Sequence, residues 1–459
     1  MKFMFRRPII ATVLAAMAVC LGIIAVSRWQ QAGTSSRRTD GSYLQLLRDA
    51  HRAVTAAYVE KPDGKKLVQS MVDGMLAALD PHSAYLPPEP YHEMEIQMSG
   101  AFGGVGIELG MRENRLVVIA PIEDTPAFRA GIQADDHIWK IDGVSTRGMS
   151  INAAVKRMRG EKGTPVSLSI LRNSITAPIV FNLVRDTIRL KSLRSRTIKP
   201  GYGFIRISQF QERTGSEFRQ ALKDLHAAQP DGQLQGLIID LRYNPGGLLQ
   251  AAVDVANCFI GDDASQTVIV SMKGRTQEAS RVFHATLGEK EPRYPIAVLM
   301  NGGSASASEI VAGALQDHKR GLVVGSQSFG KGSVQSIFPL KDNGALKLTT
   351  ARYYTPSGRS IQAKGIAPDI AVGTKEPVVP VSGKKKGIDF AEKDLDNRLS
   401  AVPTAGAERE GKPSPAPDTT VAPHGNREPD LIKDYQLKRA LDLLQSLVAV
   451  REQGYLKGR

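Results

Sequence analysis

The sequence predicts a multidomain protein in which a small β-rich domain precedes a larger α/β domain. The chain has 459 residues, more than one ordinary hydrophobic core accommodates. From residue 189 to residue 372, continuous apolar segments alternate with helical ones, which is typical of a sheet covered by helices on both faces. From residue 98 to residue 188, short apolar segments are separated by glycine turns. These two patterns divide the middle of the chain into two domains.

An uncharged segment lies near the amino terminus. Residues 8–27 carry no charge, and Lys2, Arg6 and Arg7 precede them. A helix of that length spans ~30 Å, which matches the hydrocarbon core of a bilayer. Positive residues before such a segment favour a cytoplasmic amino terminus. We therefore expect residues 1–35 to be a membrane anchor or a cleaved signal segment, with the rest of the chain on the far side of the membrane.

The next region, residues 36–97, is predicted to be helical. Apolar residues recur there at helical spacing in two stretches. They are Tyr43, Leu46, Leu47, Ala50 and Val54 in the first stretch, and Leu67, Met71, Met75 and Leu76 in the second.

The order of strands and turns in residues 98–188 resembles a PDZ domain of the bacterial, circularly permuted type. The sequence GGVGIEL, at residues 103–109, places a glycine-rich turn before a strand. Such a turn exposes backbone N–H groups that hold a terminal carboxylate, while the strand edge pairs with the peptide. We expect this site to comprise Gly104, Val105, Gly106 and Ile107. The alternative is that the glycines form only a hairpin turn.

Two motifs supply the side chains of a candidate hydrolytic site. NGGSASASEI, at residues 301–310, leads into an alanine-rich helix, and SFGKGSVQ, at residues 328–335, contains a lysine between glycines. A serine hydroxyl becomes a nucleophile when a base removes its proton, and a desolvated lysine amine can be that base. Composition alone leaves Ser304, Ser306 and Ser308 as equal candidates.

Five motifs, in the same order, resemble those of the carboxyl-terminal processing proteases, also called tail-specific proteases. They are GMLAALDPHSAY at residues 74–85, DLRYNPGG at 240–247, YTPSGRSIQ at 354–362, and the serine and lysine motifs. The likeness runs from about residue 43 to residue 370. It implies a crotonase-like, ClpP-related core and a serine endopeptidase that recognises the carboxyl-terminal region of a protein substrate and cuts nearby.

The resemblance also assigns catalytic roles. Matched position by position, it makes Ser306 the nucleophile and Lys331 the base, and it gives Gln335 the role of orienting the lysine amine. Lys331 must be neutral to accept a proton, and burial lowers the pKa of a lysine. Gln335 follows Lys331 by four residues, so one helical turn would bring the two side chains to a single face.

An oxyanion hole is expected beside the nucleophile. The backbone N–H of Ala307 lies at a helix start, where free N–H groups can stabilise the negative charge of an attacked carbonyl oxygen. Gly246 is our choice for the second donor because the NPGG sequence lets a backbone approach closely, and Gly247 is the alternative.

Three further residues occupy positions outside this catalytic set. The DPHS sequence at residues 80–83 recurs in the family as a non-catalytic element, so we expect His82 to have a capping or turn role. Asp317 should give structural support, because a carboxylate beside the lysine would raise the pKa of that base. Arg159, just after the predicted groove helix, is either a gate that reaches toward Gln335 or a solvated arginine at a helix end.

Other chemistries fit less well. The sequence GSQSFGKG has the spacing of a phosphate-binding loop, but Gly332 replaces the serine or threonine that such a loop requires. No spacing of histidine and cysteine suits zinc, so we expect neither a metal nor a cofactor. The net charge of +14 is dispersed, and no nucleic-acid motif accompanies it. A PDZ scaffold with a vestigial core would be favoured only if the serine, lysine or glutamine were missing.

The end of the chain changes composition. Residues 373–428 are rich in Pro, Lys, Glu, Gly and Ala and predict a flexible linker, whereas residues 429–459 return to helical spacing and predict a terminal helix. The resemblance allows a homo-oligomer and a helical-repeat adaptor protein as partners. Together with the amino-terminal segment, it implies the bacterial cell envelope, on the periplasmic side of the inner membrane, either anchored or released after cleavage.

Overall fold

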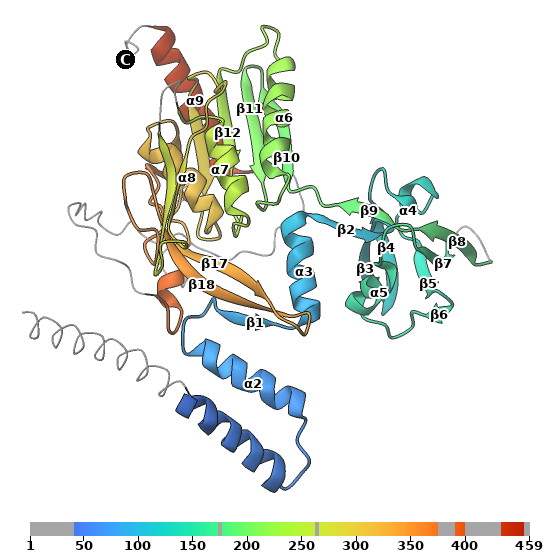
Figure 1. Ribbon diagram of the computed structural model, residues 1–459. Coiled ribbons are helices and arrows are strands. Elements are labelled where there is room, and N and C mark those ends of the chain that lie inside the picture. The colour runs from blue at the N-terminus through green and yellow to red at the C-terminus, as the bar shows by residue number, and fades with distance from the viewer. Residues whose placement is uncertain (1–40, 173–176, 262–265, 375–390, 400–432, 454–459) are drawn as a thin grey trace, which may run out of the picture. The chain divides into compact units, whose positions relative to one another are not determined.

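A computed structural model describes residues 41–172, 177–261, 266–374, 391–399 and 433–453 (Figure 1). The predicted anchor, residues 1–35, lies outside these ranges. Within them, no helix is both long and apolar enough to cross a membrane. The chain divides into two compact units, residues 1–76 and 77–459, and each is described by itself.

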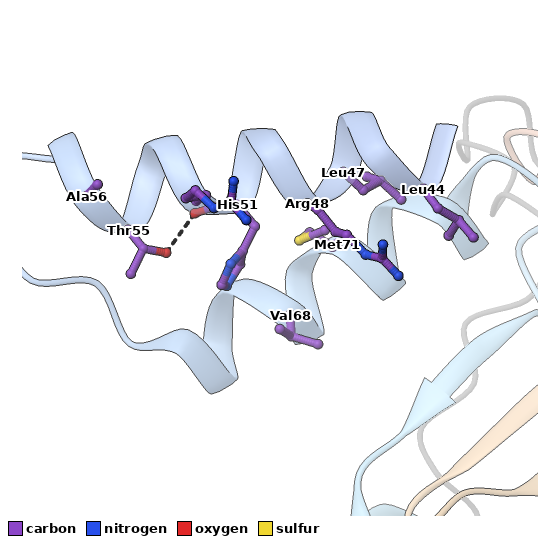
Figure 2. Close-up of a pocket in the computed structure, with 9 residues that line it drawn as sticks. Leu44, Leu47, Arg48, His51, Thr55, Ala56, Val68 and Met71 are labelled. Carbon is purple, nitrogen blue, oxygen red and sulfur yellow. Dashed lines mark hydrogen bonds between the residues drawn. The ribbon is translucent and has the colours of Figure 1, made fainter. Parts of the chain in front are cut away.

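The first unit contains a pair of helices, as its apolar spacing predicts. One covers residues 41–57, and the other, α2, covers Gly64–Ala77. A groove of about 650 Å³ lies between them, and Figure 2 shows the apolar and polar residues that line it. The lining residues include Leu44, Leu47, Val68 and Met71. None of the predicted catalytic residues belongs to this groove.

The second unit begins with a turn, a strand and a helix. Asp80 Oδ1 accepts hydrogen bonds from the N–H groups of His82 at 2.8 Å and Ser83 at 3.0 Å, which confirms the predicted turn. Strand β1 (Ala84–Leu86) and helix α3 (Pro88–Ser99) follow it.

The PDZ region consists of a sheet with the order β3-β4-β5-β7-β8, in which β6 pairs with β5, and a separate β2–β9 pair. Its elements are β2 (Ala101–Gly104), β3 (Ile107–Arg112), β4 (Arg115–Pro121), α4 (Pro126–Arg129), β5 (His137–Ile141), β6 (Val144–Ser145), α5 (Ile151–Met158), β7 (Pro165–Leu171), β8 (Ile179–Val184) and β9 (Asp186–Arg189). A hydrophobic core of its own, which includes Val118, Ile138 and Leu168, holds this region together.

The larger domain is built on a sheet with the order β10-β11-β12-β15-β16-β19. Its strands are β10 (Leu193–Lys199), β11 (Tyr202–Ile207), β12 (Gly236–Asp240), β15 (Ile296–Met300), β16 (Leu322–Gly325) and β19 (Ile370–Ala371). All neighbouring strands are parallel except β10 and β11. Strands β12 and β15 are buried along their whole length, which explains their continuous apolar sequences.

Helices cover this sheet on both faces, as the alternating pattern predicts (Figure 1). Leu237 and Ile239 of β12 point into the core that contains residues of α6 (Thr214–Ala227), α7 (Leu249–Asn257) and α8 (Ala307–Asp317). Ile238, between them, belongs to the opposite core, which contains residues of α9 (Tyr435–Glu452). Adjacent residues of a strand point to opposite faces, so one strand serves both cores.

A second sheet has the order β1-β18-β13-β14, with β17 also paired to β18. Its remaining strands are β13 (Val268–Gly274), β14 (Arg281–His284), β17 (Ser333–Pro339) and β18 (Ala345–Tyr354). Gln335 lies in β17 and Lys331 precedes that strand, so residues 331–335 do not form the helical turn that would bring the two side chains to a single face. The pairing of β17 with β18 satisfies this backbone instead.

Residues 391–399 depart from the linker predicted for residues 373–428. They include the short helix η1 (Glu392–Asp394), and the Glu392 side chain is fully buried. Hydrogen bonds from Gln362 Nε2 at 2.8 Å and His82 Nε2 at 2.8 Å satisfy its carboxylate. These partners come from distant parts of the chain, which is why local composition did not reveal the segment.

Candidate active site

The site forms where parallel strands β12 and β15 end at the same edge of the sheet. The loop after β12 contains Asn244, the loop after β15 contains Ala305, and Ser308 lies in the first turn of α8. The carbonyl oxygen of Asn244 accepts hydrogen bonds from the Ala305 N–H at 3.0 Å and the Ser308 hydroxyl at 2.9 Å. Tyr243 N–H also donates to Asn301 Oδ1 at 3.0 Å. The two loops are therefore fixed to each other on either side of Ser306.

Of the three candidate serines, only Ser306 has an uncommitted hydroxyl. Ser304 is fully buried and donates to the Leu241 carbonyl oxygen at 2.8 Å, and the fully buried Ser308 donates to Asn244. Ser306 is partly exposed at the start of α8, and its hydroxyl, unlike the other two, donates to no group among the described residues. Its φ of 53° is sparsely populated for a residue with a side chain, which is common at functional sites.

Gly246 lies directly against this serine. A Cβ atom on Gly246 would be 2.8 Å from the Ser306 Cβ and 3.0 Å from the Ala307 nitrogen, and the φ of Gly246 is 105°. Only glycine fits such an approach. The Gly246 N–H donates to Asn244 Oδ1 at 2.9 Å, whereas the N–H of Gly247 has no partner among the described residues. Both glycines therefore stay candidates for the second oxyanion donor.

A buried carboxylate joins the serine motif to the lysine motif. Glu309 Oε2 accepts hydrogen bonds from the backbone N–H groups of Ser306 at 2.7 Å and Lys331 at 3.0 Å. Its other oxygen accepts from the Gly330 N–H at 2.8 Å and the Ser328 hydroxyl at 2.5 Å. Burial raises the pKa of Glu309 to about 7, although these hydrogen bonds oppose the rise. The spacing of Ser306 and Glu309 is that of a capping box and predicts the bond to Ser306, but it does not predict the bond to Lys331.

Lys331 has the environment of a base. It lies half-buried in the loop between β16 and β17, and its amine donates to no side chain or carbonyl among the described residues. Burial, and then the positive charge of Lys347, lowers the pKa of Lys331, while Glu392, Glu309 and Asp80 act in the opposite direction. The lowered pKa increases the neutral fraction of the amine at a given pH.

Gln335 is held by its amide nitrogen. Its Nε2 donates to the Ser333 hydroxyl at 2.9 Å and the Thr349 hydroxyl at 3.3 Å. Thr349 is the cross-strand partner of Gln335, next to a bulge between Val334 and Gln335. The amide oxygen accepts no hydrogen bond from the described residues.

Asp317 lies in a supporting network, as expected. It accepts hydrogen bonds from the Ser357 N–H at 2.9 Å and the Ser357 hydroxyl at 2.7 Å, and it pairs with Arg359. These contacts join the end of α8 to the YTPSGRSIQ motif.

In the PDZ region, the predicted carboxylate site lies in the turn between β2 and β3. Gly106 has a φ of 80°, and its carbonyl oxygen accepts from the Ile122 N–H at 2.9 Å. The carbonyl oxygen of Val105 accepts from the Ala127 N–H at 2.9 Å. Among the described residues, no partner takes the N–H groups of Val105 and Gly106.

Arg159 lies at the end of α5 and pairs with Glu93 of α3. Its guanidinium also stacks 4.5 Å from the centre of the Phe102 ring. No contact between Arg159 and Gln335 is present within the described ranges.

No group of three or more His, Cys, Asp or Glu side chains is arranged to hold a metal ion in the part of the chain that the structure describes.

Comparison with known proteins gives consistent matches. A model of peptidase family S41 matches residues 201–372, and a PDZ domain model matches residues 103–179. The carboxy-terminal-processing protease of Bartonella bacilliformis is 46% identical over 367 residues, which cover 80% of this chain and 83% of that protein. The carboxy-terminal processing protease CtpB of Bacillus subtilis is 36% identical, over 73% of this chain and 68% of that protein.

Among solved structures, the photosystem II D1 C-terminal processing protease shares 30% identity with a TM-score of 0.41, and the match covers 72% of this chain and 92% of that one. The extent and identity of the sequence matches establish that the chain belongs to the S41 family of carboxy-terminal processing proteases and is a serine-type peptidase with a PDZ domain.

Proposed function

We propose that the chain is an endopeptidase with a crotonase-like core and a terminal helix, and that it cleaves proteins by a Ser306–Lys331 dyad. The observation that carries this proposal is the contrast among the three serines, of which only Ser306 has a hydroxyl free to react. The lowered pKa of Lys331 supports its role as the base. Glu309 supports the pairing because it binds the backbone of both residues.

In the first step, neutral Lys331 takes the proton of the Ser306 hydroxyl while Ser306 Oγ attacks the scissile carbonyl carbon. The carbonyl oxygen becomes negative and accepts hydrogen bonds from the Ala307 N–H and from a glycine N–H. Collapse of this intermediate breaks the C–N bond, and the Lys331 ammonium gives its proton to the leaving amine. Water then attacks the carbonyl carbon of the acyl-enzyme ester while Lys331 takes one of its protons. Collapse of this second intermediate breaks the bond between that carbon and Ser306 Oγ, Lys331 returns the proton to Oγ, and the carboxylic acid product leaves.

The second oxyanion donor depends on Asn244. If Gly246 fills this role, as we propose, its N–H must exchange Asn244 Oδ1 for the substrate oxygen. Gly247 would need no such exchange and is the alternative. Asn244→Ala removes the acceptor of the Gly246 N–H and therefore distinguishes the two glycines. The stability of this variant must be measured as well, because Asn244 also donates to the Ile207 carbonyl oxygen at 2.9 Å.

We propose that the PDZ domain selects substrates by their carboxyl-terminal region. The unpartnered N–H groups of the Val105–Gly106 turn can hold a carboxylate, and the edge of β3 can pair with the peptide. The test uses one fluorogenic peptide with a free carboxyl terminus and the same peptide amidated. Amidation should raise KM and leave kcat nearly unchanged. Equal KM values for both peptides would remove the carboxylate from recognition.

Arg159 remains a proposed gate for this domain. To reach Gln335, it would have to leave Glu93 and Phe102. If the gate operates, Arg159→Ala should lower activity on a protein substrate with a free carboxyl terminus more than on its amidated form. If wild type and Arg159→Ala show the same ratio of activity on the free substrate to activity on the amidated substrate, Arg159 is not a gate and only contacts α3.

We infer an envelope location from the first residues of the sequence. The positive residues followed by the uncharged segment 8–27 support anchoring, or release after cleavage, on the periplasmic side of the inner membrane. Digestion of spheroplasts with an external protease tests this location, because a periplasmic domain would be degraded while a cytoplasmic marker survives. A homo-oligomer and a helical-repeat adaptor are proposed from the resemblance alone, and light scattering of the purified protein tests the first.

A further inference from the structure

We propose that Asp80, acting through Thr349, is a positioning residue that fixes the Gln335 amide so that its oxygen is free to accept a hydrogen bond from the Lys331 amine. This inference rests on the proposed dyad. It assigns a function to the DPHS turn, which the catalytic scheme otherwise leaves unused.

Asp80 is the fixed end of the chain of hydrogen bonds. It is only 5% exposed, and it accepts from the N–H groups of His82 and Ser83, from the Ser83 hydroxyl at 2.7 Å and from the Thr349 hydroxyl at 3.0 Å. Burial acts to raise the pKa of Asp80, but the hydrogen bonds from Ser83, His82 and Thr349 hold that pKa below its ordinary value. An ionised carboxylate can only accept hydrogen bonds, so every group that faces it must donate.

This fixes the direction of the Thr349 hydroxyl. A hydroxyl has one hydrogen to donate, and the hydrogen of Thr349 points to Asp80 Oδ1. Toward Gln335, the Thr349 oxygen therefore presents only a lone pair. The backbone holds Thr349 in place as well, because its N–H donates to Ser83 Oγ at 3.1 Å. Both the side chain and the backbone of Thr349 therefore join β18 to the DPHS turn.

The direction of Thr349 in turn selects the orientation of the Gln335 amide. A lone pair attracts the amide nitrogen and repels the amide oxygen, so Nε2 faces Thr349 at 3.3 Å. The second hydrogen of Nε2 goes to Ser333 at 2.9 Å. With both hydrogens used, the amide oxygen is the remaining polar atom and can accept only from a further donor. The amine of Lys331 is a donor whether neutral or charged.

Loss of this chain of bonds would allow the amide to rotate. Without Asp80, the Thr349 hydroxyl could donate to the amide oxygen, and the NH2 group would then face the amine. The N–H groups of the Gln335 amide would then face the N–H groups of the Lys331 amine, with no acceptor between them, and Gln335 would no longer orient Lys331. The expected loss is therefore in kcat, because the proposed contact acts on the base and not on substrate binding.

The test compares two substitutions of Thr349 with a matched control. Thr349→Val keeps the shape of the side chain but removes the hydroxyl, and Thr349→Ser restores it. Thr350→Val is the control because it breaks the hydroxyl pair with Ser336, at 2.6 Å, on the same two strands. With a fluorogenic peptide, Thr349→Val should lower kcat by about tenfold with KM unchanged, the size expected for losing one hydrogen bond. Thr349→Ser should recover most of that loss, and Thr350→Val should keep the wild-type kcat.

A double-mutant cycle connects the loss to Gln335. In a Gln335→Ala background, Thr349→Val should cause no further loss of kcat, because the amide that it orients is gone. When circular dichroism shows it to be folded, Asp80→Ala should lower kcat by a similar factor at a pH where the base is neutral, because at lower pH it also removes a charge that raises the pKa of Lys331. An equal loss from Thr349→Val with and without Gln335 would overturn the inference, as would a kcat for Thr349→Val equal to that of Thr350→Val.

The same experiment separates this inference from the proposed function. If Gln335→Ala keeps the wild-type kcat while Lys331→Ala is inactive, the positioning chain is refuted and the dyad stands. If Lys331→Ala is itself active, the dyad is refuted.

Discussion

The carboxylate of Glu309 accepts a hydrogen bond from the backbone N–H of Ser306 at 2.7 Å. Because the same oxygen accepts from the N–H of Lys331, one fully buried side chain sets the separation of the proposed nucleophile and base. Four donors converge on this carboxylate, so its role depends on having two acceptor oxygens.

Glu309→Gln should therefore lower kcat by at least about tenfold and also lower the melting temperature, because an NH2 group must face donors that have lost their acceptor. Peptide cleavage and thermal unfolding measure the two effects. Glu291→Gln is a matched control, since Glu291 accepts from His226 and Tyr294 outside the catalytic loops. It should lower stability without changing kcat. A Glu309→Gln variant with wild-type kcat would show that the carboxylate does not position the dyad.

Glu309 should also make stability depend on pH. Its pKa is about 7 in the folded chain against an ordinary 4.5, so between these pH values the folded state keeps a proton that the unfolded state releases. The stabilisation is complete below the unfolded pKa and is lost as pH rises through 7. Relative to Glu309→Gln, the wild type should lose on the order of 3 kcal/mol of unfolding free energy between about pH 4.5 and pH 8.

Urea unfolding of both proteins across this range measures the difference. If the free energy of unfolding changes with pH equally in wild type and in Glu309→Gln, Glu309 does not titrate in this pH range. Comparing the two proteins is necessary because other carboxylates and histidines titrate in the same range.

The pH dependence of cleavage should follow the charges around Lys331. Lys347 lowers the pKa of Lys331 and Glu392 raises it. The rise of kcat/KM with pH should therefore move to higher pH in Lys347→Met and to lower pH in Glu392→Gln. Burial and the carboxylates of Glu309 and Asp80 also affect the pKa of Lys331 and are the same in all three proteins. The two variants and the wild type are therefore compared at the same ionic strength, so that only the substituted charge differs.

Glu309, whose pKa is about 7, is a second group whose titration can produce such a rise. The rise of kcat/KM with pH should therefore be measured again in Glu309→Gln, where it persists if Lys331 is the base. Its disappearance in that variant would assign the titration to Glu309. A fall of activity above neutral pH, with no alkaline rise, would point to a different base.

Gly246→Ala tests the oxyanion site. The new Cβ would lie 2.8 Å from the Ser306 Cβ and 3.0 Å from the Ala307 nitrogen, where the substrate oxygen is expected. We expect a loss of kcat of about 100-fold or more, the size seen when one oxyanion donor is removed. Gly148→Ala is the control, because Gly148 has a positive φ of 75° but nothing within 4 Å. It should cost stability only, and an equal loss of kcat in both variants would assign the effect to backbone strain.

The sequence predicted what depends on local pattern. The covered sheet follows from the continuous apolar strands β12 and β15, and the position of Ser306 at a helix start follows from the motif and the helix after it. The β-rich PDZ region likewise follows from its glycine turns and short strands.

What the sequence could not predict depends on contacts between distant residues. Gln335 lies in a strand because β18 pairs with it, although spacing from Lys331 suggested a helix. The buried Glu392 lies within a segment of linker composition because Gln362 and His82 satisfy its charge. The bond from Glu309 to Lys331 joins motifs that only the fold brings together.

Cleavage by serine and lysine variants tests the central claim most directly. With fluorescently labelled casein as substrate, Ser306→Ala and Lys331→Ala should each lower kcat/KM by about a thousandfold or more, and the double variant should be no worse, because residues that act as one unit are not additive. Ser304→Ala and Ser308→Ala remove buried structural hydroxyls, so they should lower the melting temperature but keep substantial activity. Activity in Ser306→Ala, with Ser304→Ala or Ser308→Ala inactive though folded, would contradict the assignment.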